Sequence, residues 1–140
     1  MQGFGRTDLS NVMDKSMGLY VPNKEDAQLS TGQAHQYCLN VKSQSTNPLK
    51  VTIVWTDPPS SPAAKIHLVN DLDLVVVTPS GDKLFGNGGK SSVKQTRDEP
   101  DQLNNVEQVE METTDPVGKY NISKYLFTCL DDINNTSCER

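Results

Sequence analysis

Short segments in which apolar residues recur at every second position constrain this chain most. In "LKVTIVW", Leu49, Val51, Ile53 and Trp55 share one phase, and the polar residues Lys50 and Thr52 lie between them. A period of two places these four side chains on one face of a half-buried β-strand, with Trp55 among the core positions. The same pattern recurs less regularly in "HQYCLNV" (35–41), "NNVEQVEM" (104–111) and the start of "GKYNISKYLF" (118–127).

The segments between these strands are typical of turns and surface loops. "TDPPSSPAA", "TPSGD" and "FGNGGKSS" are dense in Pro, Gly and Ser. Only "TDLSNVMDK" has a helical pattern, with Thr7 or Asp8 as its N-cap. The 140 residues suffice for one domain with a core. We therefore expect an all-β fold, a jelly-roll or galactose-binding-like β-sandwich with one short N-terminal helix.

Two strands carry irregularities that need a physical account. In 118–127, Tyr120 and Ile122 are in phase, but the phase slips near Lys124, as it would at a bulge or a strand end. In "LVNDLDLVV" (68–76), the most apolar part of the chain holds acids. Its residues alternate between one face with Asn70, Leu72, Leu74 and Val76 and another with Asp71, Asp73, Val75 and Val77.

Two carboxylates on one face of a buried strand repel each other and are costly to bury without compensation. One hypothesis is hydrogen bonding from backbone N–H groups and the amides of Asn104 and Asn105, without a metal. The other is a calcium ion, which takes oxygen ligands from carboxylates, amides and carbonyls. Its predicted ligands are Asp71, Asp73, Asn104 and Glu107.

Charge and hydropathy exclude two classes of partner. The formal net charge of −5 and the lack of a basic patch argue against nucleic acid. The longest apolar run, 72–77, is interrupted by Asp73 and is too short to cross a bilayer. A signal peptide requires a basic segment followed by an apolar one, and neither follows Met1. We expect either a cytosolic protein or an internal piece of a longer chain.

Cysteines and sequons bear on the compartment. Without a CxxC, the three cysteines do not predict a zinc site; Cys129 and Cys138 could close a small loop, leaving Cys38 over, or all three could be free thiols. Asn-x-Ser/Thr sequons, weak indicators of a secreted protein, occur at Asn121, Asn134 and Asn135.

Catalytic motifs are absent from the sequence. It contains no GxSxG, and its two histidines are His35 and His67. Cys38 lies three residues from His35, which on a strand places the two on opposite faces. "FGNGGK" has neither the spacing nor the Ser/Thr of a phosphate-binding loop and reads as a turn.

An ordered set of segments resembles the subtilisin-like serine proteases. "GFGRTDLSNVM" (3–13) is similar to the end of their catalytic domain, where a Gly-aromatic-Gly-Arg segment leads into the last helix. The segments that follow resemble the β-sandwich domain found after the catalytic domain in one branch of that family. They are "VWTDPP" (54–59), "LVNDLDLVVVTPSG" (68–81), "FGN" (85–87), "NNVEQV" (104–109) and "GKYNI" (118–122).

The resemblance covers residues 3–122 and implies an organisation. Residues 1–17 would end the catalytic domain, 18–128 would form the β-sandwich accessory domain, and 129–140 a polar tail. The Gly-Thr-Ser segment that carries the family's nucleophile is absent, so no catalytic residue can be assigned and no peptidase activity is expected. The resemblance also implies structural calcium, without locating the ion.

The resemblance implies that the parent chain is a subtilisin-like serine endopeptidase and that this chain is accessory to its protease domain. The domain would stabilise the protease domain and help to hold a protein or peptide substrate, outside the cell or facing its exterior. The alternative is a carbohydrate- or cell-surface-binding jelly roll, which rests on fold analogy. A third hypothesis, a cytosolic structural domain, would be favoured by three reduced cysteines.

Overall fold

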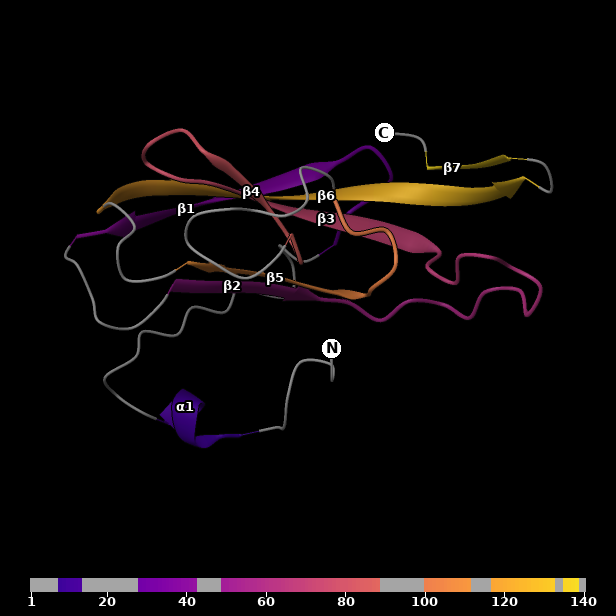
Figure 1. The fold of residues 1–140 in the computed structure, drawn as a ribbon, viewed down its shortest axis with the longest axis horizontal. Coiled ribbons are helices and arrows are strands. Elements are labelled where there is room, and N and C mark those ends of the chain that lie inside the picture. Colours follow the sequence, from indigo (N-terminus) through magenta and orange to yellow (C-terminus); the bar gives the residue numbers. More distant parts are fainter. Residues whose placement is uncertain are drawn as a thin grey trace.

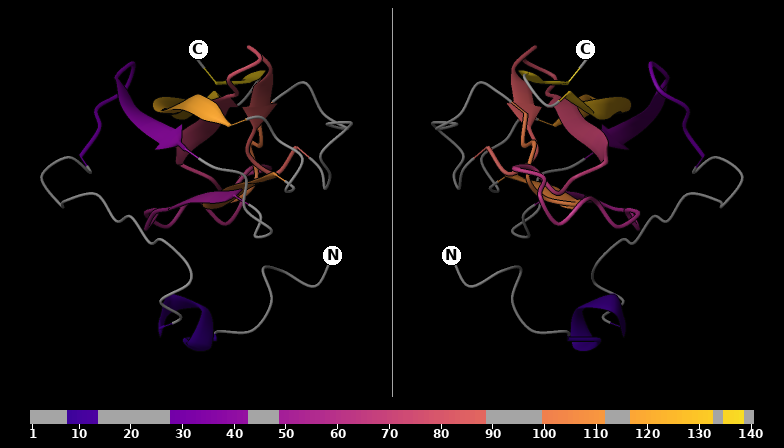
Figure 2. Two further views of the ribbon diagram at one scale, coloured as in Figure 1. Left: turned by 90° about the vertical axis from the view of Figure 1, so that its left-hand side faces the viewer. Right: turned by 90° about the vertical axis from the view of Figure 1, so that its right-hand side faces the viewer.

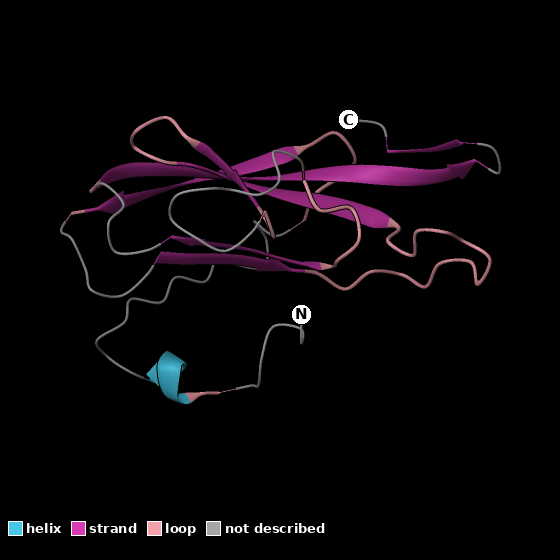
Figure 3. Ribbon diagram, viewed as in Figure 1, coloured by secondary structure: helices cyan, strands magenta, loops and turns pink. Residues whose placement is uncertain are grey.

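The computed structural model describes residues 8–13, 28–42, 49–88, 100–111, 117–132 and 135–138. Seven strands and one helix of four residues lie in these ranges. Figure 3 colours the helix cyan and the strands magenta. In chain order they are α1 Ser10–Met13, β1 Ala34–Val41, β2 Leu49–Val54, β3 Asn70–Val77, β4 Lys83–Phe85, β5 Val106–Met111, β6 Gly118–Asp132 and β7 Asn135–Cys138.

The strands form two antiparallel sheets that lie face to face (Figure 1). One has the order β1-β6-β3-β4, with β7 added to β6, and the other pairs β2 with β5. The expected all-β class is thus confirmed, and the single helix among the described residues is the four-residue α1. Asp8, one of the two residues predicted as N-cap, lies two residues before the start of that helix, and its Oδ1 accepts hydrogen bonds from the backbone N–H and the hydroxyl of Ser10.

A small apolar core fills the space between the two sheets. The larger sheet contributes Leu74, Val76 and Tyr120, and β5 contributes Val109 and Met111. Alternating residues of β1 and β2 pack around this cluster and are partly buried, as the period of two predicts. They are Leu39, Val41, Leu49, Val51 and Ile53.

Trp55 is less buried than the alternation predicts. It follows the last residue of β2 and is half-buried, so the expectation of a fully buried tryptophan is wrong in degree. Its indole Nε1 donates a hydrogen bond of 2.9 Å to the carbonyl of Asn70. The ring therefore lies at one end of the sandwich. It is partly covered there, and its polar N–H edge bonds to the start of β3.

The phase slip near Lys124 is not a bulge or a strand end. Every residue of β6 from Asn121 to Thr128 has one partner on β3, with Leu74 opposite Lys124. Lys124 is buried on the same face as Ile122, and its Nζ lies 5.8 Å from the centre of the Tyr37 ring. A long side chain of this kind can bury its stem in a core position, so the backbone stays regular.

β4 was not anticipated from the sequence. It lies where two segments that read as turns, 78–82 and 85–92, adjoin, yet Val75 pairs with Phe85 and Val77 with Lys83. β4 is only three residues long, and it leaves the edge of β3 uncovered before Val75. This uncovered edge positions the candidate site.

Candidate functional site

The start of β3 is covered on both faces. Asp71 and Asp73 are buried, and so are Leu74 and Val76, although adjacent strand residues point to opposite faces. The sequence prediction placed Asp71 and Asp73 on one face of this strand, and the regular pairing with β6 agrees with that. Both acids therefore need polar surroundings at this end of the sandwich.

A clasp from the loop after β2 holds Asn70. The Asp57 carboxylate accepts three hydrogen bonds, from the backbone N–H of Val69 at 2.7 Å and from the backbone and side-chain N–H groups of Asn70, each at 2.9 Å. Trp55 donates to the Asn70 carbonyl from the same loop. We call Trp55, Asp57 and Asn70 the base clasp, because they close the loop 56–69 at its base.

Glu107 reaches across from β5 to the uncovered edge of β3. Its Oε2 accepts a hydrogen bond of 2.7 Å from the backbone N–H of Leu74. The Leu74 carbonyl accepts from the N–H of Gly86, where β4 has just ended. The carboxylate thus replaces a missing strand partner, which a buried backbone N–H group requires.

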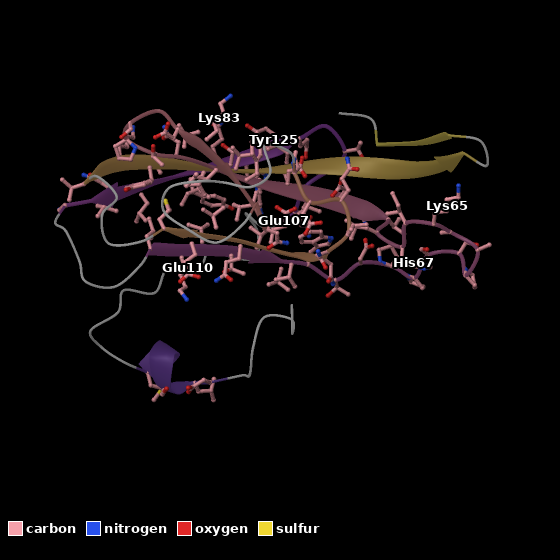
Figure 4. The ribbon with its side chains drawn as sticks, in the orientation of Figure 1. Lys65, His67, Lys83, Glu107, Glu110 and Tyr125 are labelled. Carbon is pink, nitrogen blue, oxygen red and sulfur yellow. The ribbon has the colours of Figure 1, made fainter. Side chains whose placement is uncertain are left out.

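Gly86 leaves the room for that carboxylate. A β-carbon at this position would overlap Glu107 Oε2 and would lie 2.7 Å from the Glu107 Cβ. Figure 4 shows Glu107 between the two layers, whereas Glu110, also on β5, points away from the larger sheet. Outside the sandwich, Glu110 forms a 3.1 Å ion pair with Lys50.

Asn87 connects the end of β4 to β5. Its backbone N–H donates to the Gln108 carbonyl, and its Oδ1 accepts from the Gln108 N–H. Its Nδ2 donates to Asp101 at 2.7 Å and to the Val106 carbonyl at 2.8 Å. The backbone of Asn87 has a φ of +56°, a left-handed conformation that Asn tolerates better than most residues.

Asp101 is buried, and both of its carboxylate oxygens accept hydrogen bonds. Besides Asn87, it accepts from the N–H of Leu103 at 3.0 Å and from the Nδ2 of Asn104 at 2.6 Å. Asn104 was a predicted calcium ligand, and here its amide bonds to Asp101. Asn105 instead donates to the Trp55 carbonyl at 3.1 Å. The two asparagines thus support the sandwich rather than Asp71 and Asp73.

The buried acids shift the protonation of Glu107. Burial raises the pKa of Glu107 to about 8, the Leu74 hydrogen bond opposes the rise, and the carboxylates of Asp73, Asp101 and Asp71 add to it. Glu107 is fully buried, and its second oxygen, Oε1, has no hydrogen-bond partner. A proton on this carboxyl group removes one negative charge from the cluster.

The described side chains do not form a coordination site for a metal ion. Asp71, Asp73 and Glu107 lie close enough for their charges to interact. Within the described ranges, however, no three His, Cys, Asp or Glu side chains converge as metal ligands. The oxygen-only donor set suits calcium in chemistry, but its present arrangement does not form a coordination shell.

The other residues singled out in the sequence form no catalytic arrangement. His35 is half-buried and Cys38 is exposed, on opposite faces of β1 as predicted. His67 lies on the exposed loop before β3 (Figure 4), and its Nδ1 is 3.2 Å from the Ser60 hydroxyl. Asn121 is exposed, the side chain of Asn135 is not described, and Asn134 lies outside the described residues.

The amino-acid sequence is similar to a part of three much longer proteins. The sequence matches no protein-family profile. It is 31% identical over 131 residues to the serine protease/ABC transporter B family protein tagA of Dictyostelium discoideum. The matched region covers 86% of this chain. The sequence is 38% identical to tagD and 40% identical to tagB of the same organism, over 97 residues each.

The chain spans less than a tenth of the length of these relatives, from 5% to 7%. It is therefore homologous to a part of serine protease/ABC transporter proteins. The relation to serine proteases agrees with the resemblance found in the sequence. Among the described residues, no helix is long and apolar enough to span a membrane.

Sequence reasoning missed Asp57, Gly86, Asn87 and Asp101. Three of them lie in segments that carry the resemblance: Asp57 in "VWTDPP", and Gly86 and Asn87 in "FGN". The signal was present as a set of short motifs, but the contacts between them join residues that are 12 to 50 positions apart. Only the fold shows that these motifs meet at one end of the sandwich.

Proposed function

We propose that this chain is a non-catalytic accessory domain of a subtilisin-like serine endopeptidase, preceded by the last residues of the catalytic domain. The observation that carries the proposal is the homology to a part of serine protease/ABC transporter proteins. The base clasp and the Glu107 contact support it, because they give the motifs of the resemblance a shared structural role.

The domain would pack on the protease domain and stabilise it, and it would help to hold a protein or peptide substrate. Exposed apolar side chains support a packing role. Leu9 and Met13, in and beside α1, are 69% and 78% exposed, and α1 stands apart from both sheets (Figure 2). Val54 and Leu103 are also largely exposed. Surfaces of this kind are stabilised when a second domain covers them.

The parent chain would act outside the cell or face its exterior. The exposed position of Asn121 in a sequon supports such a location, because glycosylation requires an accessible side chain. The catalytic triad would lie upstream, and the protease domain of the same chain would be the main partner.

The parent protein provides the test. We expect the coding sequence upstream of Gly3 to contain a Gly-Thr-Ser segment. In the purified parent, Asp57→Ala should shorten the half-life of peptidase activity at elevated temperature while the initial activity on a short peptide stays near that of the wild type. An upstream sequence without a protease domain, or an unchanged half-life in an Asp57→Ala parent whose accessory domain melts earlier, would contradict the proposal.

The alternative is a carbohydrate- or cell-surface-binding module. Such modules present exposed aromatic side chains to sugars. The large hydrophobic side chains that are exposed in the described ranges are Leu, Met and Val, and none is aromatic. Binding of the labelled chain to a glycan array distinguishes the two functions. A sugar-binding module should bind to glycans on the array, and an accessory domain should bind to none.

Structural calcium is a second proposal about the acidic cluster. The buried Glu107 Oε1, which lacks a hydrogen-bond partner, supports it, and an ion would require the acids to move together, because they do not converge among the described residues. If calcium binds the native state, unfolding free energy should rise by about 2.7 kcal/mol at a hundredfold excess over Kd. Melting curves in EDTA and in millimolar calcium measure this rise. An unchanged midpoint, with Asp71→Asn and Asp73→Asn both destabilising, would favour hydrogen bonding and a protonated Glu107.

A further inference from the structure

The hairpin at the end of the chain extends beyond the sandwich. β6 pairs with β1 as far as Tyr125 and with β3 as far as Thr128. Its last residues, 129–132, pair with β7, which has no other partner among the described strands. Figure 1 shows this pair reaching past the other strands of its sheet. An isolated two-stranded antiparallel pair is marginally stable in water at best.

The register of this hairpin brings two cysteines together. Cys129 is directly opposite Cys138, and three further pairs follow toward the chain reversal, ending with Asp132 opposite Asn135. Directly opposite residues of antiparallel strands have Cα atoms about 4.5–5.5 Å apart. A disulfide requires about 4.4–6.8 Å between Cα atoms, so the backbone placement suits a cross-strand bond.

The third cysteine cannot take part in this bond. Cys38 is opposite Asn121 on β6, which lies eight residues from Cys129 along the same strand. At about 3.3 Å per residue, the separation is about 26 Å. Cys38 is exposed and has a free thiol. The fold therefore selects one pairing out of the three that a set of three cysteines allows.

We propose that Cys129 and Cys138 form a disulfide that closes the β6–β7 hairpin, with Cys38 left as the free thiol. The two thiols lose two protons and two electrons as the S–S bond forms. A small-molecule disulfide such as oxidised glutathione accepts both and is released as two thiols. Such bonds persist in oxidising compartments, so this disulfide implies a chain that folds outside the cytosol.

Thiol labelling of the complete 140-residue chain tests the pairing. The Cys38→Ser variant, which cannot form dimers through Cys38, is equilibrated with a mixture of reduced and oxidised glutathione and then alkylated without reduction. We expect no alkylated cysteine and a mass lower by two hydrogens, with Cys129 and Cys138 joined in one peptide. Alkylation of both cysteines, or glutathione bound to each, would overturn the proposal.

A displaced cysteine separates register from mere proximity in sequence. In the Cys38→Ser background, Ser137→Cys with Cys138→Ser moves the thiol by one residue, opposite Leu130. A one-residue shift turns the side chain to the other face of the strand pair, so we expect at least a tenfold larger alkylated fraction. Equal protection in the displaced variant would show that a flexible loop, and not the strand register, permits the bond.

Discussion

At the scale of single residues, the stability of this domain depends on acids in unusual surroundings. Glu107 is fully buried, bonds to the backbone of another sheet through one oxygen and lies near three further carboxylates. Asp57, by contrast, receives three N–H donors and is compensated by hydrogen bonds. Glu107 therefore predicts a response to pH, and the hydrogen bonds of Asp57 predict a response to mutation.

The raised pKa of Glu107 predicts that the domain loses stability as the pH rises. The folded-state pKa of about 8 lies above the ordinary value of 4.5. The stabilisation is therefore complete below about pH 4.5 and is lost as the pH rises through about 8. The free energy of unfolding should fall by at most about 5 kcal/mol over this range, the equivalent of the difference between the two pKa values. Urea unfolding at pH 5, 7 and 9 measures the free energy of unfolding.

Glu107→Gln is the matched variant, because an amide oxygen can still accept from Leu74 but carries no charge. We expect it to be more stable than the wild type at pH 9 and to lack most of the pH dependence. A wild type that becomes more stable between pH 5 and pH 9 in EDTA would contradict a protonated Glu107.

The contact between Gly86 and Glu107 predicts that a single methyl group destabilises the domain. Gly86→Ala places a β-carbon against Glu107 Oε2 and Cβ, and overpacking of this kind costs about 1–3 kcal/mol. Chemical denaturation provides the measurement. In a Glu107→Ala background the cost of Gly86→Ala should shrink, since the carboxylate is gone while the β-carbon remains. An equal cost in both backgrounds would argue against this contact.

At the scale of elements, polar contacts attach the small sheet to the large one. The base clasp joins the end of β2 to the start of β3, and Glu107 joins β5 to β3. The bidentate pairing of Asn87 with Gln108 joins the end of β4 to β5. The apolar core lies between these sheets, so the polar contacts fix their relative position at one end.

Removing the clasp should loosen β3 from the loop before it. Asp57→Ala leaves the N–H groups of Val69 and Asn70 without their acceptor. We expect a loss of about 2–3 kcal/mol in unfolding free energy. The fluorescence of Trp55, the single tryptophan, follows the transition. Asp82→Ala, at an exposed acid, is the control and should change stability by no more than about 0.5 kcal/mol.

At the scale of the whole molecule, the chain should be inert as an enzyme. It lacks the Gly-Thr-Ser segment, and its histidines are not part of a nucleophile–base–acid arrangement in the described structure. We expect no cleavage of casein or of a chromogenic peptide and no labelling by a serine-directed fluorophosphonate. The parent protein is the positive control. Labelling of a serine in the 140-residue chain would refute the accessory role.

The sequence by itself determined the fold class and most of the strands. The period of two in 49–55 and 35–41 is a local property, because successive side chains of a strand point to opposite faces whatever the strand pairs with. The ordered motifs pointed to a serine protease relative, and homology supports that relation. Whether the acids of β3 need a metal stayed open, because a linear pattern does not show which donors come within reach.

Only the tertiary structure decided the partners of each polar residue. Glu107 meets Leu74 across 33 positions of sequence, and Gly86 makes room for it from a third element. β4 was missed because three residues give too short a pattern, and the apparent bulge at Lys124 was a lysine in a core position of a regular strand. Long-range contacts of this kind depend on strand order and register, which follow from packing the whole chain and not from local periodicity.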